Sequence, residues 1–146
     1  MCVMCLLLLF LSGFSIFLIM ENKKVTGIGG VFIKAQNRKD LCAWYDKHLG
    51  TSFNGNTYTS FNWKETGEEG TTGSTVFNFF AEDSKYFDPS TKTVMLNLRV
   101  TNLIELLAKL KADGVQVVDK VEEYDYGKFG WIIDAEGNKI ELWEPK

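Results

Sequence analysis

The stretch Ile33-Lys34-Ala35-Gln36-Asn37-Arg38-Lys39-Asp40-Leu41 decides the fold, because it returns in outline as Leu98-Arg99-Val100-Thr101-Asn102-Leu103-Ile104-Glu105-Leu106. The two copies begin 65 positions apart, at 33 and 98. Each copy runs from a predicted strand into a predicted helix, so the chain is expected to contain two copies of one unit of roughly 60 residues. Each position in one half can therefore be compared with its partner in the other half.

The composition is that of a globular domain, with 146 residues, 45% hydrophobic and 24% charged. A chain of this length can bury one good core, so we expect one compact domain. The net charge of −3 makes nucleic acid an unexpected partner, because surfaces that bind it are usually basic. Two of the three cysteines lie in the N-terminal apolar stretch, which leaves Cys42 as a reduced helix residue and no disulfide framework.

The first twenty residues, Met1 to Met20, are nearly all apolar and carry no charge. This is about the length that crosses a bilayer as a helix, and Lys23 and Lys24 behind it would keep the domain on the cytoplasmic side. A secretory signal fits less well, because no basic residue precedes the stretch and no small-x-small site follows it. The other interpretation is that Met20 is the true start. In both main interpretations the domain is expected in the cytoplasm, and any membrane contact is through residues 1–20.

Periodicity predicts the elements of the first half. Residues 25–35 are rich in β-formers and form the first strand. Asn37 is the expected N-cap of a helix that stops at Gly50. Short strands are expected at 60–63 and 75–80, a mobile loop at 65–74 and a connection between the halves at 82–93.

The second half shows the clearer pattern. Asn102 is the expected cap, Glu105 completes a capping box, and leucines at 103, 106, 107 and 110 form one helical stripe that ends before Gly114. Strands are expected at 115–118, 128–133 and 139–143, with a hairpin turn at 134–138. The overall expectation is an α+β fold of two β-α-β-β-β units in tandem.

Two phrases carry a family resemblance: Val25-Thr26-Gly27-Ile28-Gly29-Gly30-Val31-Phe32-Ile33-Lys34, and the ending Asp134-Ala135-Glu136-Gly137-Asn138-Lys139-Ile140-Glu141-Leu142-Trp143-Glu144-Pro145. With the tandem units they make residues 24–146 resemble the glyoxalase, bleomycin-resistance and extradiol-dioxygenase superfamily, the vicinal oxygen chelate proteins. The resemblance implies modules at about 24–82 and 92–146, whose curled sheets surround an open cavity, often in a homodimer. Members bind a divalent metal in that cavity or use it only to hold a ligand.

The resemblance places metal ligands at four positions, which here are Gly30, Met95, Phe77 and Glu141. Only Glu141 can coordinate a hard cation, and a metal such as zinc generally wants three or more protein ligands. The single imidazole, His48, lies at a helix end, where a surface role is the simpler interpretation. We therefore expect no metal and no other cofactor, with Glu141 as the remaining candidate ligand.

Alternation along the strands predicts what lines the cavity. If Gly30 faces inward, so do Phe32, Lys34, Met95, Asn97, Arg99, Glu141 and Trp143. Glu141 then serves either as an acid, base or hydrogen-bonding group aimed at a ligand, or as the ion-pair partner of Lys34 or Arg99.

Further aromatic side chains are candidates for the same cavity. The segment 122–131 interleaves acids with Tyr124, Tyr126, Phe129 and Trp131, which suits either a pocket rim that stacks on an organic ligand or a hairpin packed on the core. Trp63 and Phe77 are ligand-binding candidates under the same alternative, because aromatic residues on strands often build cores.

Two functions follow from these residues. The first is metal-independent binding of a small aromatic or cationic organic molecule in an aromatic-lined cavity. The alternative is an enzyme, a lyase, isomerase or dioxygenase of the same superfamily, in which Glu141 is a proton-transfer base or a metal ligand. The loss of three of the four ligand positions favours binding.

Overall fold

The computed structural model describes residues 24–64 and 72–146. The first half contains β1 (Val25–Ala35), α1 (Arg38–Leu49), β2 (Tyr58–Lys64) and β3 (Thr72–Ala81). A short 3₁₀ turn, η1 (Lys85–Phe87), lies in the connection. The second half contains β4 (Val94–Val100), α2 (Leu103–Ala112), β5 (Gln116–Tyr124), β6 (Gly127–Ile133) and β7 (Lys139–Pro145).

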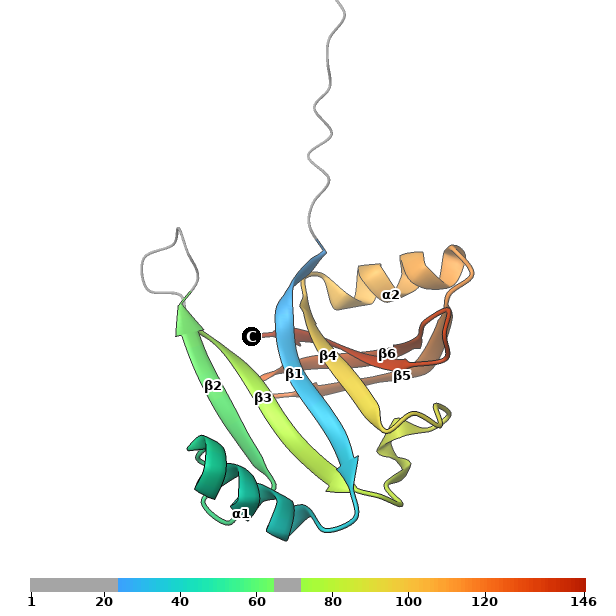
Figure 1. Cartoon of the computed structure of the whole chain (residues 1–146). Helices are drawn as coiled ribbons and strands as arrows, with labels where there is room; N and C mark the ends of the chain where they lie inside the picture. The colour runs from blue at the N-terminus through green and yellow to red at the C-terminus, as the bar shows by residue number, and fades with distance from the viewer. Residues whose placement is uncertain (1–23, 65–71) are drawn as a thin grey trace, which may run out of the picture.

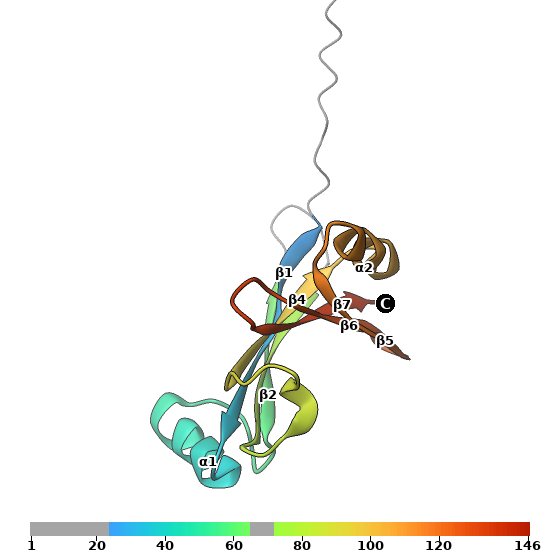
Figure 2. The same cartoon turned by 90° about the vertical axis from the view of Figure 1, so that its right-hand side faces the viewer.

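All seven strands join one sheet in the order β2-β3-β1-β4-β7-β6-β5. The two halves meet where β1 pairs with β4, antiparallel, and each half contributes one parallel pair, β1 with β3 and β4 with β7. The sheet curls without closing, so that β5, β6 and β7 run across the direction of β1 and β4 (Figures 1 and 2). The predicted α+β class, with a curled open sheet, is confirmed.

The register between β1 and β4 confirms the internal repeat. Gly30 pairs with Asn97, and Phe32 pairs with Met95. By the repeat offset of 65, Gly30 corresponds to Met95 and Phe32 corresponds to Asn97. Each residue of the Gly30–Asn97 pair therefore has its repeat partner in the Phe32–Met95 pair. The halves are therefore related by an approximate two-fold axis through the centre of the sheet.

The halves differ by one strand. By their pairing, β2 and β3 correspond to β6 and β7, and β5 has no counterpart in the described part of the first half. The chain at 50–57 instead forms a loop tied to α1, because the Asp46 carboxylate accepts hydrogen bonds from Thr51 Oγ1 and from the backbone N–H groups of Phe53 and Asn54. This loop buries Phe53 completely. As a result β2 forms the edge of the sheet.

The two helices are capped differently. Asn37 caps α1 as predicted, because its side-chain oxygen accepts from the Asp40 N–H at 3.3 Å. The predicted capping box of Asn102 and Glu105 is wrong: Asn102 adopts φ 52° and its side chain makes no cap hydrogen bond. The Glu144 carboxylate, at the end of β7, accepts from the Leu103 N–H at 2.8 Å instead. A tertiary contact has replaced the local one.

Both helices pack on the outer face of the sheet. The leucine stripe of α2 contacts β-strand residues of the second half around Val100 and Leu142. Around α1, Cys42, Phe53 and Phe79 form the buried cluster, with Tyr45 and Phe77 packed against it. Phe77 thus lies on the helix side of β3, and the prediction that it faces the cavity is wrong.

The strand bounds also differ from the prediction. Strand β2 begins at Tyr58 and β3 at Thr72, so residues 72–74 of the predicted loop belong to the sheet. Strand β5 reaches Tyr124 and forms a tight hairpin with β6. The predicted turn at 134–138 is confirmed, because the Asp134 carboxylate accepts from the N–H groups of Glu136 and Asn138.

Two predictions fall on residues outside those described: the apolar stretch 1–20 and the loop at 65–71. In the part of the chain that the structure describes, no helix has the length and apolar character needed to cross a membrane.

The connection 82–93 packs on the inner face of the sheet. Ser90 Oγ donates to the Gly137 carbonyl at 2.7 Å, and Lys139 Nζ donates to the Tyr86 carbonyl at 2.6 Å. Phe87 is fully buried with Phe32, Met95 and Trp131. The side chains of the connection therefore fill part of the space that the sheet encloses.

Candidate functional site

Three neighbouring strands place polar side chains in one row on the inner face. Asn97 of β4 pairs with Glu141 of β7, and Glu141 pairs with Trp131 of β6. Residues that pair directly across strands point to the same face, so these three side chains meet. The connection adds Tyr86 above them. We call Glu141, Asn97, Trp131 and Tyr86 the polar centre.

Glu141 accepts all the hydrogen bonds of the polar centre. The Asn97 side-chain N–H donates to its Oε1 at 2.6 Å, and the Trp131 indole N–H donates to its Oε2 at 2.8 Å. The Tyr86 hydroxyl donates to the same Oε2 atom. Glu141 is only 2% exposed, and the three donors satisfy the hydrogen-bonding capacity that its carboxylate would otherwise lose on burial.

The predicted ion pair of Glu141 with Lys34 or Arg99 is wrong. Lys34 Nζ lies 5.1 Å from the centre of the Phe87 ring. Arg99 turns toward the other end of the sheet, where its Nε donates to Thr26 Oγ1 at 2.9 Å. The sequence offered matched basic residues as partners, but neutral donors hold the carboxylate.

The charge of Glu141 also affects its neighbours. Burial, followed by the negative charge of Glu141, raises the pKa of Tyr86 well above its usual range, so its hydroxyl stays protonated and can donate. Burial lowers the pKa of Lys139, whose ammonium lies 5.4 Å from the ring centres of both Tyr86 and Trp131. Lys139 therefore packs against the polar centre through its aromatic members.

The register corrects one of the four predicted ligand positions. In the second half, Glu141 of β7 pairs with Asn97 of β4. The repeat partner of Asn97 is Phe32, and Phe32 of β1 pairs with Asn78 of β3. The counterpart of Glu141 is therefore Asn78, not Phe77. The Asn78 Oδ1 atom is buried and has no hydrogen-bond partner among the described residues.

The residues at these positions do not fit a metal centre. Gly30 and Met95 offer no hard donor atom, and Asn78 offers only an amide. The Glu141 oxygens that would bind a cation face N–H and O–H donors instead. In residues 24–64 and 72–146, no group of three or more His, Cys, Asp or Glu side chains is placed to hold a metal ion.

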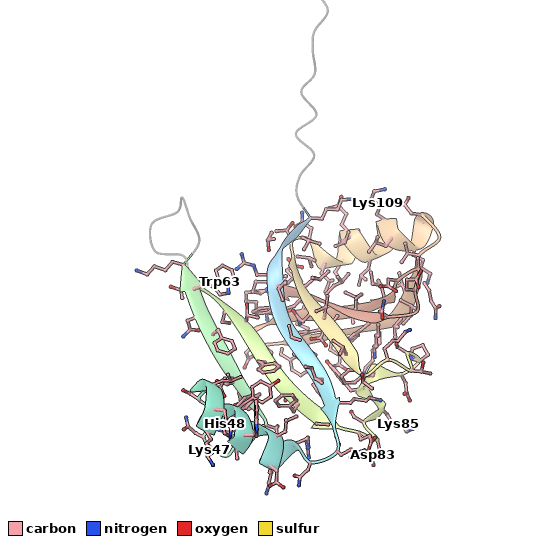
Figure 3. The ribbon with its side chains drawn as sticks, viewed as in Figure 1. Lys47, His48, Trp63, Asp83, Lys85 and Lys109 are labelled. Carbon is pink, nitrogen blue, oxygen red and sulfur yellow. The ribbon has the colours of Figure 1, made fainter. Side chains whose placement is uncertain are left out.

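Phe32 and Met95, two predicted cavity residues, do lie on the inner face. They are 8% and 1% exposed because Phe87 of the connection covers them. His48 lies far from this face, as predicted for a surface residue: it is exposed on α1, with its ring 4.9 Å from that of Trp44 (Figure 3).

A second group of candidate residues lies on neighbouring strands at the other end of the sheet. The Arg99 guanidinium lies 4.8 Å from the Trp63 ring centre, and Arg99 is also the register partner of Trp143. The Trp143 ring is stacked with Phe129 at 6.2 Å and 8°. The group ends in two tyrosines, at 5.9 and 5.8 Å from Phe129. We call this group the aromatic arc: Trp63, Arg99, Trp143, Phe129, Tyr124 and Tyr126.

The aromatic arc is open to solvent, whereas the polar centre is closed. Tyr124 and Tyr126 are 44% and 61% exposed, and the other four members are half-buried. Gly29 allows the arc and the polar centre to touch, because a Cβ there would overlap Asn97 Oδ1 and lie 2.8 Å from Trp143 Cε3. Asn97 Oδ1 is itself buried without a hydrogen-bond partner in the described structure.

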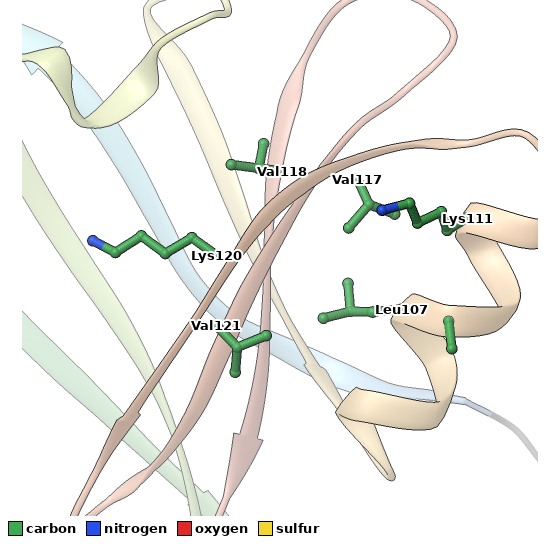
Figure 4. A pocket seen from close by; sticks show the side chains of 7 residues that line it. Leu107, Lys111, Val117, Val118, Lys120 and Val121 are labelled. Atoms are coloured by element: carbon green, nitrogen blue, oxygen red, sulfur yellow. The ribbon is translucent and has the colours of Figure 1, made fainter.

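One hollow adjoins the aromatic arc, and another lies beside α2. The first, of about 420 Å³, meets the arc at Arg99 and is lined by Thr26, Arg99, Val100, Thr101, Asn102, Glu144 and Pro145. The second, of about 210 Å³, lies between α2 and β5, around Leu107 and Val121 (Figure 4). The first extends the surface of the arc, whereas the second is apart from both the arc and the polar centre.

No protein-family model matches this sequence, and no curated protein matches it significantly. Solved structures do match. Methylmalonyl-CoA epimerase from Mycobacterium tuberculosis is 21% identical, with a TM-score of 0.53 over 88% of this chain and 93% of that one. The chain has the fold of methylmalonyl-CoA epimerase.

Two further structures agree. An epimerase bound to methylmalonyl-CoA and NH4+ is 16% identical, with a TM-score of 0.58 over 83% of this chain and 95% of that one. A variant of the Streptomyces coelicolor epimerase bound to 2-nitronate-propionyl-CoA has the same identity and TM-score, over 83% of this chain and 98% of that one. At these identities the likeness establishes the fold.

Sequence reasoning missed three residues of the polar region: Tyr86, Asn78 and Lys139. Tyr86 lies in a segment that has no repeat partner, so comparison of the halves gave no signal for it. Lys139 and Glu141 are two apart on one strand, and that spacing could have placed them on the same face. Asn78 was one position from the residue chosen, and only the register distinguishes the two.

Proposed function

We propose that this chain is a metal-independent protein of the vicinal oxygen chelate fold that binds a small planar organic molecule along the aromatic arc. The observation that carries the proposal is the arc itself. Arg99 lies against the Trp63 ring, its register partner Trp143 stacks on Phe129, and Phe129 contacts both tyrosines. These side chains come from β2, β4, β7, β6, β5 and the β5–β6 turn, and solvent reaches the surface that they form.

The chemistry of the arc suits a flat, unsaturated ligand. Aromatic pairs favour stacked or edge-on contacts, each worth about 0.5–1.5 kcal/mol beyond the area that they bury. The nearly parallel rings of Trp143 and Phe129, at 8°, and of Tyr124 and Tyr126, at 3°, offer two stacking surfaces. Small-molecule sites are commonly built this way, with aromatic walls and few polar groups.

Arg99 and Asn97 supply the polar groups. The Arg99 guanidinium is positioned by Thr26 and by the Trp63 ring, so its position costs little entropy when a ligand arrives. Asn97 Oδ1 lies beside Gly29 and Trp143, where an N–H or O–H at the edge of a ligand stacked on Trp143 would find an acceptor after a small shift of the ring. The preferred ligand is therefore aromatic with a hydrogen-bond donor at its rim.

The solved structures with this fold support a small organic ligand, because some of them hold CoA esters. The enzyme alternative, a lyase, isomerase or dioxygenase, rests on Glu141, the one carboxylate buried in the described residues. A base must come within hydrogen-bond reach of the proton that it removes. Tyr86 and Trp131 already occupy Oε2, so Glu141 acts first as a structural acceptor, and binding is the function that the geometry supports better.

Tryptophan fluorescence tests the proposal, because Trp143 and Trp63 lie in the arc. The full chain is titrated with a panel of planar aromatic molecules that carry an N–H or O–H group. We expect saturable quenching by at least one member, at least tenfold weaker binding in Trp143→Ala, and unchanged binding in Trp44→Ala, which removes an exposed indole on α1. Equal binding by all three proteins would overturn the assignment of the arc.

A further inference from the structure

The hollow of about 420 Å³ beside the aromatic arc carries side chains of both charges on its walls. Arg99 reaches it from β4, and Glu144 reaches it from β7, where it follows Trp143 of the arc. The other polar residues of the lining are Thr26, Thr101 and Asn102. The hollow therefore adds a charged compartment to the aromatic surface.

The Arg99 guanidinium is held where the arc meets the hollow. Its Nε donates to Thr26 Oγ1 at 2.9 Å, and the Thr26 hydroxyl donates to the Arg99 carbonyl at 3.2 Å. The Trp63 ring centre lies 4.8 Å from the guanidinium. A guanidinium carries five N–H donors in a planar fork that matches the two oxygens of a carboxylate. Arg99 is thus a positioned group for an anionic part of a ligand.

Glu144 supplies the negative wall. Its side chain is half-buried, and its Oε2 atom accepts from the Leu103 N–H at 2.8 Å. Lys128 is its register partner, but the ion pairs among residues 24–64 and 72–146 do not include Glu144. Because an ionised carboxylate can accept about four hydrogen bonds, Glu144 can also accept from an ammonium in the hollow.

Two opposite charges on one hollow discriminate between ligands. A singly charged anion is attracted by Arg99 and repelled by Glu144, and a singly charged cation meets the reverse. A ligand that carries both a carboxylate and an ammonium is attracted by both walls. The charges of the hollow therefore favour a zwitterion.

We propose that the arc and the hollow together bind an aromatic α-amino acid. Its ring stacks on Trp143, its carboxylate binds Arg99 and its ammonium binds Glu144. In such a molecule both charged groups stand on a carbon two bonds from the ring, and Trp143 is the register partner of Arg99 and the chain neighbour of Glu144. This inference rests on the proposed function and names the ligand class for the same surface.

Calorimetric titration of the full chain with a series of indoles tests the proposal. L-Tryptophan carries both charged groups, tryptamine lacks the carboxylate, indole-3-propionate lacks the ammonium, and indole lacks both. Every member keeps the ring N–H that can donate to Asn97 Oδ1. We expect L-tryptophan to bind at least about tenfold more tightly than each of the others.

Matched variants separate the two charged contacts. Glu144→Gln should weaken the binding of L-tryptophan at least about fivefold and should not weaken indole-3-propionate, which has no ammonium. Arg99→Gln should weaken L-tryptophan and indole-3-propionate more than tryptamine, which reports any indirect effect through Trp63. Glu105→Gln, an exposed change on α2, should leave every titration unchanged. Circular dichroism confirms that each variant is folded.

The outcomes distinguish this inference from the proposed function. Equal binding of all the indoles, lost in Trp143→Ala, would overturn the amino-acid assignment and leave the arc as a binding surface. Tight binding of L-tryptophan that neither charge variant weakens would also overturn it. Absence of binding by the whole series would overturn it as well, and the wider fluorescence panel then decides the proposed function by itself.

Discussion

Trp131 and Glu141 are direct register partners on β6 and β7, and the indole N–H of Trp131 donates to the Glu141 carboxylate at 2.8 Å. Trp131 is 4% exposed and Glu141 is 2% exposed, so this bond has no competition from water. Removal of one partner of such a buried hydrogen bond lowers the free energy of unfolding by more than the net contribution of the bond, because the remaining partner stays buried without a hydrogen bond.

Replacement of Glu141 tests how much its buried hydrogen bonds contribute to stability. In Glu141→Gln the side-chain amide brings its own N–H groups toward the donors of Trp131 and Tyr86, so we expect the free energy of unfolding to fall by about 2–4 kcal/mol. Urea denaturation gives the value. Glu136→Gln, an exposed change in the nearby turn, serves as control and should stay within about 0.5 kcal/mol of the wild type. Equal effects would show that burial of the carboxylate is unimportant.

The raised pKa of Tyr86 makes the stability of the protein depend on pH. Burial and the charge of Glu141 raise its pKa above the ordinary value of 10.0, so the folded state holds the hydroxyl proton more tightly than the unfolded state. That stabilisation is complete below pH 10 and is lost as the pH rises above it. Tyr86→Phe should therefore destabilise the protein by about 1–3 kcal/mol at pH 7, and the gap should shrink toward about pH 11. Urea denaturation at several pH values checks this, and a gap that widens would refute it.

Gly29 is predicted to tolerate no side chain. A Cβ there would overlap Asn97 Oδ1 and crowd Trp143, both of which are held by neighbours, so Gly29→Ala should cost about 2 kcal/mol or more. Gly27→Ala is the matched change on the same strand, where the nearest atom to a new Cβ is 3.9 Å away. Thermal melting compares the two, and similar melting temperatures would argue against the close packing of the arc on the polar centre.

The capping of α2 gives a further test. Glu144→Gln weakens the acceptor for the Leu103 N–H and removes a negative charge at the helix start, so we expect a loss of about 1 kcal/mol. Glu105→Gln, at the position where the sequence pattern suggests a capping box, should lose only a few tenths of a kcal/mol. Chemical denaturation measures the stability of both variants. A larger loss in Glu105→Gln than in Glu144→Gln would show that Glu105, and not Glu144, caps α2.

The repeat was enough to predict the class of fold, because strand-to-helix transitions and hydrophobic stripes are local patterns. It also placed most of the inner-face residues correctly, since alternation along a strand has a fixed period. It failed at Phe77 because a shift of one residue in matching the halves moves a side chain to the other face.

Tertiary contacts account for what the sequence could not show. Glu144 caps a helix that begins 41 residues earlier, and Tyr86 reaches Glu141 from the connection, at a separation of 55 residues. Neither contact leaves a periodic signal. The pairing of Glu141 with a base was a reasonable inference from charge, but a buried carboxylate can also be satisfied by neutral donors.

The central claim is that the aromatic arc binds a planar molecule without a metal. Calorimetric titration of the full chain with the best ligand from the fluorescence panel, before and after treatment with excess chelator, tests it most directly. The account predicts the same dissociation constant in both titrations and at least tenfold weaker binding in Trp143→Ala. Binding that disappears with the chelator, or a panel from which nothing binds, would contradict it.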